Sequence, residues 1–492
     1  MSKLYVFGIG GTGARVIRSM MMLAASGVEF KTDSIVPVIV DPDIANEDLS
    51  RTISLIKRYN DIRDYLRYDN KTIKNRFFKT EIKDVMDGYH FHLNNTRDVR
   101  FKDYIGHNSM GKENMSLASI LFSIDNLDAD MEVGFKGNPN IGSVVLNQFE
   151  GSVDFEKFAS DFTPGDRIFI ISSIFGGTGA SGFPLLVKTF RGITNRHSNA
   201  AAIASAPIGA ITVMPYFKVK PDPDSKIDSD TFISKTKAAL HYYDKNVYGD
   251  QSAVNVMYSI GDIGDNQYDN HEGGRDQVND AHIVEFASAL AIADFLNYDS
   301  THKSMNVAED ANQNIYYAPD VLFKEFGIED DVPTVLLQHL AEKTNMCIRK
   351  AMTQFVLFSR YVKSHLSDAV SQPWANDNKI DKAFLVADFT NNINLFTDEY
   401  LGWLSEMAGN NRAFKPYTLD VPDSNLYSIV NGVSPSSIKA LWAFGKGGCD
   451  LFDSALNNEH KKGLPEDFSC EQKFIDMFYE ASRVIVEGKY KF

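Results

Sequence analysis

Seven consecutive small residues in the first half of the chain have the composition of a phosphate-binding loop: Gly176-Gly177-Thr178-Gly179-Ala180-Ser181-Gly182. The apolar run Ile168–Ile171 before them is typical of a buried parallel strand, and an apolar helical pattern with Pro184 in its first turn follows them. Glycines let the backbone approach an anion, successive N–H groups point toward it, and the helix dipole adds about half a positive charge. The hydroxyls of Thr178 and Ser181 are further candidate donors. The alternative is a plain turn between a strand and a helix.

A second glycine loop, Gly8-Ile9-Gly10-Gly11-Thr12-Gly13, stands between the short apolar strand Leu4–Phe7 and a helical pattern. Its glycines satisfy the G-x-G-x-x-G pattern of dinucleotide sites, in the strand-to-helix context that this pattern requires. A Rossmann dehydrogenase is therefore one hypothesis for the chain.

Asp41 is the candidate acidic partner of this second loop. In a dinucleotide site the acid lies at the end of the second strand, about 20 residues beyond the glycines. The second strand is expected at Ile35–Val40, so Asp41 follows it directly but comes late in the sequence. A turn residue before Pro42 is the alternative.

A third loop rich in glycine and asparagine spans residues 134–143 and includes Gly137, Asn138, Pro139 and Gly142. A helix is expected after it at Val144–Glu150. Three such loops suggest one anionic ligand that is contacted from several sides. This arrangement favours a nucleoside triphosphate over a dinucleotide.

A long apolar helix is expected at Asn279–Asn297, with Asn279 or Asp280 as its N-cap. Its body is apolar nearly all round, so it must be buried on every side. His282 and Glu285 lie three residues apart, which fits a hydrogen-bonded pair at the helix start better than a metal site.

Composition limits the classes of function. The chain has 492 residues, enough for two or three domains, and a net charge of −15, which argues against binding nucleic acid or anionic membranes with its whole surface, although a local basic patch stays open. Its three scattered cysteines indicate reduced thiols in a cytoplasmic protein. No apolar run is long enough for a membrane span, so no membrane insertion is expected.

The three loops together resemble the tubulin/FtsZ superfamily. The run Gly176–Gly182 is similar to GGTGSG of tubulins and GGGTGTG of FtsZ, with one residue inserted or with Ala180 and Ser181 in place of a single residue. Gly8–Gly13 resembles the FtsZ opening VIGVGGGG, and Gly137–Gly142 resembles the FtsZ γ-phosphate loop GGNPEVG. The order and spacing of the loops agree with the family over roughly residues 3–300.

The resemblance implies a Rossmann-like α/β nucleotide-binding domain with a parallel sheet at residues 1–278, a long central buried helix at 279–299 and a divergent, helix-rich α+β domain at 300–492. It also implies GTP or GDP as ligand, with Mg²⁺ bound through the nucleotide phosphates. The candidate nucleotide-binding residues are Gly8, Gly10, Gly11, Thr12, Gly13, Asp41, Gly137, Asn138, Pro139, Gly142, Gly176, Gly177, Thr178, Gly179, Ser181 and Asn279.

In this superfamily, a short acidic loop after the central helix completes the GTPase site of the next subunit in a filament. Asn297-Tyr298-Asp299 resembles the first half of the FtsZ pattern NxDxxD, but the second acid is absent at the matching place. The resemblance therefore implies that Asp299, Asp294 and Asn297 act in trans and that the chain associates with itself. Solvation of a helix end is the alternative role for these side chains.

The C-terminal half does not resemble the family's usual second domain, and it could contact a protein partner. Patterns in this half predict helices at Asp331–Ser367, Thr397–Met407, Ser436–Ala443 and Phe468–Glu487, and a strand at Ala383–Ala387. Three classes of function compete: a self-assembling GTPase, a non-hydrolysing nucleotide-binding scaffold of a larger assembly, and an NAD-dependent Rossmann oxidoreductase. The two additional phosphate loops disfavour the third.

Overall fold

A computed structural model of the chain describes residues 2–68, 75–96, 98–131, 135, 138–221, 229–248, 253–262, 267–269, 274–275, 278–299, 308–309, 315–316, 321–326 and 332–492. Gly137, one of the candidate phosphate-loop residues, lies outside these ranges, as does Asp331, the expected start of a long helix.

A parallel sheet forms the centre of the N-terminal part. Its strand order is β11-β7-β5-β4-β1-β2-β3, and every neighbouring pair is parallel. The strands are β1 (Lys3–Ile9), β2 (Ser34–Val40), β3 (Glu81–Ile82), β4 (Arg167–Ser173), β5 (Ile208–Val213), β7 (Val256–Ile260) and β11 (Leu322–Glu325). The central strands β1, β2, β4 and β5 are buried along nearly their whole length, as apolar runs with both faces covered should be. The predicted α/β class with a parallel sheet is confirmed.

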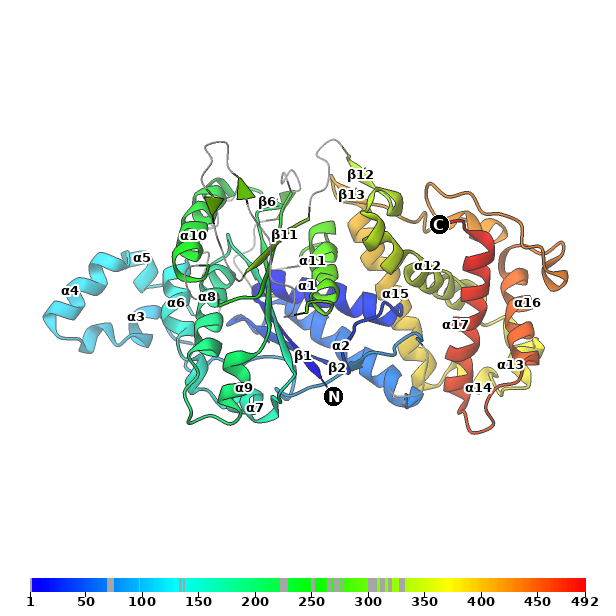
Figure 1. Cartoon of the computed structure of the whole chain (residues 1–492), viewed down its shortest axis with the longest axis horizontal. Helices are drawn as coiled ribbons and strands as arrows, with labels where there is room; N and C mark the ends of the chain where they lie inside the picture. The colour runs from blue at the N-terminus through cyan, green and yellow to red at the C-terminus, as the bar shows by residue number, and fades with distance from the viewer. Residues whose placement is uncertain are drawn as a thin grey trace.

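Helices cover both faces of this sheet (Figure 1). On one side lie α1 (Gly10–Ala25), α2 (Glu47–Leu66) and α11 (Ile283–Phe295), and α11 is buried nearly all round, as its composition predicts. On the other side lie α6 (Pro139–Leu146), α7 (Val153–Asp161), α8 (Gly177–Arg191), α9 (Ala200–Ser205) and α10 (Phe232–Asn246). The short helices α3 (Phe101–Tyr104), α4 (Lys112–Leu121) and α5 (Ile124–Leu127) project beyond α6 at one end of the molecule.

Four long helices form the C-terminal part beside α1 and α2. They are α12 (Glu342–Ser364), α15 (Asp388–Ala408), α16 (Gly448–Lys461) and α17 (Cys470–Lys489). The apolar patterns at 397–407 and 468–487 therefore predicted helices correctly. The edge strand β11 lies beyond residue 300, so the parallel sheet takes a strand from after the central helix. The division into 1–278, 279–299 and 300–492 stays a prediction.

Three predictions in the C-terminal half are wrong. The segment around Pro333 is not helical, because β-branched Thr334 and Val335 form β12 (Thr334–Val335) and pair with β13 (Ala413–Phe414); the helix α12 begins only at Glu342. The strand expected at 383–387 is instead α14 (Lys382–Leu385), which starts where the Asp381 carboxylate accepts the N–H groups of Ala383 and Phe384.

The prediction of a helix at 436–443 is also wrong. Only the 3₁₀ turn η7 (Leu441–Ala443) forms there. The backbone N–H of Ser436 donates to the carbonyl of Lys489 at 2.7 Å, so the start of this segment is tied to the end of α17 and not to its own next turn.

Three helices at the glycine loops and at the centre of the molecule start at other residues than expected, and α15 also starts earlier, at Asp388 and not at Thr397. α6 begins at Pro139 inside the third glycine loop and not at Val144. α8 begins at Gly177, so Pro184 lies well inside it and not in its first turn. α11 begins at Ile283 with His282 as its N-cap, in place of Asn279 or Asp280, because the His282 ring accepts the Val284 N–H. Among the described residues, no helix is long and apolar enough to cross a membrane.

Candidate nucleotide-binding site

The first two glycine loops lie side by side at the point where the strand order of the sheet reverses. β1 and β4 are neighbours, and the chain builds outward from β1 to β2 and from β4 to β5. α1 follows β1 and α8 follows β4. Because ligands of open parallel sheets bind outside the carboxyl ends of the strands at such a switch point, this topology points to the space at the starts of α1 and α8.

The starts of α1, α6 and α8 have a common property that suits an anion. No side chain caps any of the three in the described structure, and none has an acidic residue in its first turn. Elsewhere Asn46 caps α2 and His282 caps α11, whereas α9 and α10 also lack a side-chain cap. Uncapped first turns leave backbone N–H groups and the positive end of the helix dipole available to a phosphate.

The three loops converge. Gly10 has φ +71°, and a Cβ on it would lie 3.6 Å from the Cβ of Thr178, so the Gly8–Gly13 loop faces the start of α8. A Cβ on Gly142 would lie 2.2 Å from the Oγ of Ser181 and 3.1 Å from the carbonyl oxygen of Gly177. Glycine at position 142 therefore lets α6 pack directly on the first turn of α8.

The individual loop residues have different surroundings. A Cβ on Gly13 would lie 2.3 Å from the carbonyl carbon of Gly8, and one on Gly179 would lie 2.5 Å from the Ser173 carbonyl oxygen, so these glycines allow helices to approach strands closely. The Ser181 hydroxyl donates to the carbonyl of Gly177 at 2.7 Å, within its own helix. Thr178 is half-buried at the start of α8, facing Gly10.

Asp41 is buried at the carboxyl end of β2. Its side-chain oxygen accepts the N–H of Asp43 at 3.1 Å, which is the geometry of a turn residue. Burial raises the pKa of Asp41 to about 7, and the nearby Asp43 and Asp48 carboxylates act in the same direction. Asp43 in turn accepts the N–H of Gly274 at 2.7 Å, which ties this strand end to the segment before α11.

A buried ion-pair network joins the start of α11 to α1, and the sequence analysis did not predict it. Arg15 contacts the carboxylates of Glu285 and Asp48, and the Tyr216 hydroxyl donates to Glu285 at 2.6 Å. Burial disfavours the charge on Arg15, but Tyr216, Glu285 and Asp48 hold its pKa above the ordinary value. An arginine within the apolar face of the first helix was the available signal in the sequence.

The predicted hydrogen-bonded pair at the start of α11 is present. Glu285 accepts the N–H of His282 at 3.1 Å, which together with the His282 cap forms a capping box. Burial lowers the pKa of His282 to about 4, so its ring is neutral at physiological pH. Asn279 is half-buried before this start, and its carbonyl accepts a hydrogen bond from Arg51 at 2.8 Å.

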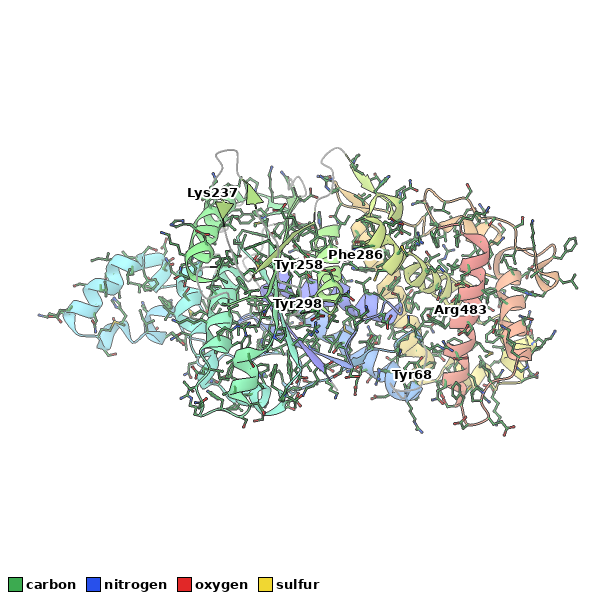
Figure 2. All side chains as sticks on the ribbon, in the orientation of Figure 1. Tyr68, Lys237, Tyr258, Phe286, Tyr298 and Arg483 are labelled. Carbon is green, nitrogen blue, oxygen red and sulfur yellow. The ribbon has the colours of Figure 1, made fainter. Side chains whose placement is uncertain are left out.

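The acidic candidates lie at the carboxyl end of α11. This end is beside the amino-terminal ends of the sheet strands, whereas the glycine loops follow the carboxyl ends. Arg167, the first residue of β4, donates to the carbonyls of Phe295 and Leu296, whereas the glycine loops follow the last residues of β1 and β4. Phe286 marks the first half of α11 in Figure 2, and Tyr298 lies just beyond its end. Thirteen helical residues separate the two ends by about 20 Å.

These three candidates have different environments. Asp294 accepts a hydrogen bond from the Tyr258 hydroxyl at 2.6 Å and pairs with Lys324 of β11. The side-chain amide of Asn297 donates to the carbonyl of Ala293 at 3.2 Å, and Asp299 is exposed beyond the helix. No group of three or more His, Cys, Asp or Glu side chains in the described ranges is placed to hold a metal ion.

Similarity of the chain to known proteins is found among solved structures. No protein-family model matches the chain, and no curated protein matches its sequence. Among solved structures, CetZ2 from Haloferax volcanii, in a GTPγS-bound protofilament, is 12% identical with a TM-score of 0.28, over 60% of this chain and 58% of that one. CetZ from Methanosaeta thermophila is 15% identical with a TM-score of 0.24, over 60% and 52%. FtsZ from M. jannaschii is 13% identical with a TM-score of 0.25, over 53% and 46%.

These structures belong to the tubulin/FtsZ superfamily, which is the one that the glycine loops resemble. The chain spans about half the length of the structures it matches. The fold is defined by the strand order of the parallel sheet and by the starts of α1, α6 and α8.

Proposed function

We propose that this chain is a tubulin/FtsZ-like GTP-binding protein that assembles with copies of itself. One observation carries the proposal: the glycine loops after β1 and β4 flank the switch point of a parallel sheet, and both start helices without a side-chain cap. A third uncapped helix start packs against the second at Gly142. Three positive helix ends around one space suit a triphosphate better than the two phosphates of NAD.

The residues present fit the nucleotide. Gly10, Gly11 and Thr12 of α1 would hold one part of the phosphate chain, and Gly177 and Thr178 of α8 another. The start of α6 at Asn138 and Pro139 would close on the far phosphate, while Asp41 and Asn279 lie on the side where the nucleoside would extend. Mg²⁺ would be held through phosphate oxygens, where it would neutralise charge that develops during hydrolysis.

The separation between the two ends of α11 supports the proposed self-association. Asp299 follows the end of α11 that lies at the amino-terminal ends of the sheet strands, and the length of this helix places that end about 20 Å from its start. A head-to-tail contact between two copies would bring this edge against the loops of the next copy, and such a heterologous contact repeats into a filament. In this proposal, Asp299 and Asn297 contact the phosphates bound by the neighbouring copy. We propose that the protein works in the cytoplasm.

One observation favours the non-hydrolysing scaffold as a second candidate. The carboxylate of Asp294 is engaged by Tyr258 and Lys324 within the chain, and beyond it the sequence has one acid, Asp299, where the FtsZ pattern has two. A single acid in place of two is the arrangement expected of a relative that binds the nucleotide without a fast filament-coupled cycle. An oxidoreductase is disfavoured because the Asp41 carboxylate accepts the N–H of Asp43 within its own turn, where a dinucleotide site needs it for the ribose hydroxyl.

The first prediction distinguishes the two candidates. In the self-assembling GTPase, phosphate release per molecule should rise with protein concentration, because the site is complete only between two copies. Asp299→Ala should lower the rate by about 10²-fold while GTP binding stays intact. Asp103→Ala, which removes an exposed acid on α3, is the control and should change neither. A flat rate across dilution, with Asp299→Ala as active as the parent, would favour the scaffold.

A further inference from the structure

The loop formed by residues 438–446, just before α16, carries large apolar side chains at the surface. The exposed fraction is 99% for Leu441 and 88% for Phe444. They lie three residues apart around the 3₁₀ turn η7, in which side chains at i and i+3 lie above one another. Ala443 is buried, so Leu441 and Phe444 project together from the outer side of the turn.

The 438–446 loop is held by hydrogen bonds, so this exposure is built into the fold. At its start, the Ser436 hydroxyl and N–H both donate to the carbonyl of Lys489 at the end of α17. Within the loop, the N–H of Ala443 donates to the carbonyl of Ala440 at 2.9 Å, and the N–H of Lys446 donates to that of Ala443 at 3.2 Å. The loop leads into α16, at the end of the molecule opposite to α4 (Figure 1).

The charged residues within the 438–446 loop have the opposite sign to the net charge of the whole chain, although Asp423 and Asp450 lie close to its end. The net charge is −15, yet no acidic residue occurs between Asp423 and Asp450, and the charged residues in that interval are Lys439 and Lys446. Both lysines are exposed. The end of α17, bonded to Ser436, brings Lys489 and Lys491 to the same region.

We propose that the 438–446 loop is a contact site for an anionic lipid bilayer. Leu441 and Phe444 would enter the boundary between head groups and acyl chains, and the partly buried Trp442 would lie at the head-group level. The lysines would lie at lipid phosphates and carboxylates, where each basic residue adds attraction to an anionic surface. Such contact is peripheral and needs no spanning helix, and it does not depend on the nucleotide.

Exposure and charge favour a bilayer over a protein partner. The two apolar side chains are almost fully exposed, and a fluid interface accepts such side chains without a matching groove. The exposed apolar side chains of α4 offer a contrast. Ile120 on α4 is 81% exposed, but Lys112 and Glu113 at the start of that helix give it a mixed charge.

Co-sedimentation with vesicles tests the proposal, using the full chain without added nucleotide. We expect binding to vesicles of phosphatidylcholine mixed with phosphatidylserine and weak binding to phosphatidylcholine alone. The double variant Leu441→Ser/Phe444→Ser should lower the apparent affinity at least about tenfold. Lys439→Gln and Lys446→Gln should each lower it about fivefold and reduce its sensitivity to salt.

The matched controls replace an exposed apolar side chain and an exposed lysine of α4, at the other end of the molecule. Ile120→Ser and Lys112→Gln should bind the mixed vesicles as the parent chain does. Of the three tryptophans, Trp374 and Trp403 are fully buried, so a shift of tryptophan emission on binding reports on Trp442. Absence of binding to mixed vesicles would overturn the proposal, as would loop variants that bind like the parent. If the double variant changes only self-association of the protein, the loop is a protein contact and the proposal is wrong.

Discussion

Gly10 is the residue at which a side chain would most directly disturb the proposed site. Its φ of +71° is left-handed, and its missing Cβ faces Thr178 across the space between the starts of α1 and α8. We expect Gly10→Ala to lower GTP affinity at least about tenfold, because the methyl group would occupy space between the two helix ends. The left-handed backbone also costs alanine about 1 kcal/mol of stability.

Gly445→Ala is the matched control for this strain. Gly445 has the same φ of +71°, with no atom near the position of an added Cβ. The Gly445→Ala variant should lose about as much free energy of unfolding in urea as Gly10→Ala, and it should retain full GTP affinity. If both variants bind GTP like the parent chain, the phosphates do not lie between these helix ends.

Asp41 predicts a pH dependence of stability. Its pKa is raised from 3.8 to about 7 in the folded chain, so the neutral acid favours folding. This contribution is fully present below pH 3.8 and is lost as the pH rises through about 7. Asp41→Asn keeps an oxygen for the Asp43 N–H and cannot ionise, so the variant should be more stable than the parent at about pH 8, by a few kcal/mol. Urea unfolding of the nucleotide-free proteins, repeated from about pH 4 to pH 8, measures the difference. Parallel stability curves would show that Asp41 does not carry this titration.

The helix α8 contains a proline that its neighbour compensates. Pro184 has no N–H for the carbonyl of Ala180, four residues earlier, and the buried Tyr243 hydroxyl of α10 donates to that carbonyl at 3.0 Å. Tyr243→Phe should cost about 1–3 kcal/mol, because it leaves a buried carbonyl without a donor. In a Pro184→Ala background the new N–H can serve Ala180, so the same change should cost less. A double-mutant cycle in urea measures this coupling, and equal costs in both backgrounds would contradict it.

At the scale of elements, the sequence predicted what local pattern controls. Glycines between an apolar strand and an apolar helix predicted the loops after β1 and β4, and the all-round apolar composition of 283–293 predicted a buried helix. Starts and ends were predicted less well, because side chains and distant backbone set them. The His282 cap moved the start of α11, and the bond from Ser436 to Lys489, 53 residues away, replaced an expected helix.

At the scale of the whole molecule, the features that local pattern missed are those that join distant parts of the chain. Arg15 meets Glu285 across 270 residues, and β11 joins β7 from beyond the central helix. Glu406 of α15 likewise pairs with Arg18 of α1 and accepts the N–H of Ala281 just before α11. The candidate site could therefore be located from its glycines, while the network that fixes α11 beside it could not, since no spacing rule relates these residues.

The most direct test of the account is calorimetric titration of the nucleotide-free chain with GTP, GDP, GMP and NAD in the presence of Mg²⁺. We expect one site per chain that prefers GTP to NAD and binds the triphosphate more tightly than the diphosphate and the monophosphate, because the start of α6 would close on the far phosphate. Equal affinity for the three guanine nucleotides, or tight binding of NAD in their place, would contradict the account.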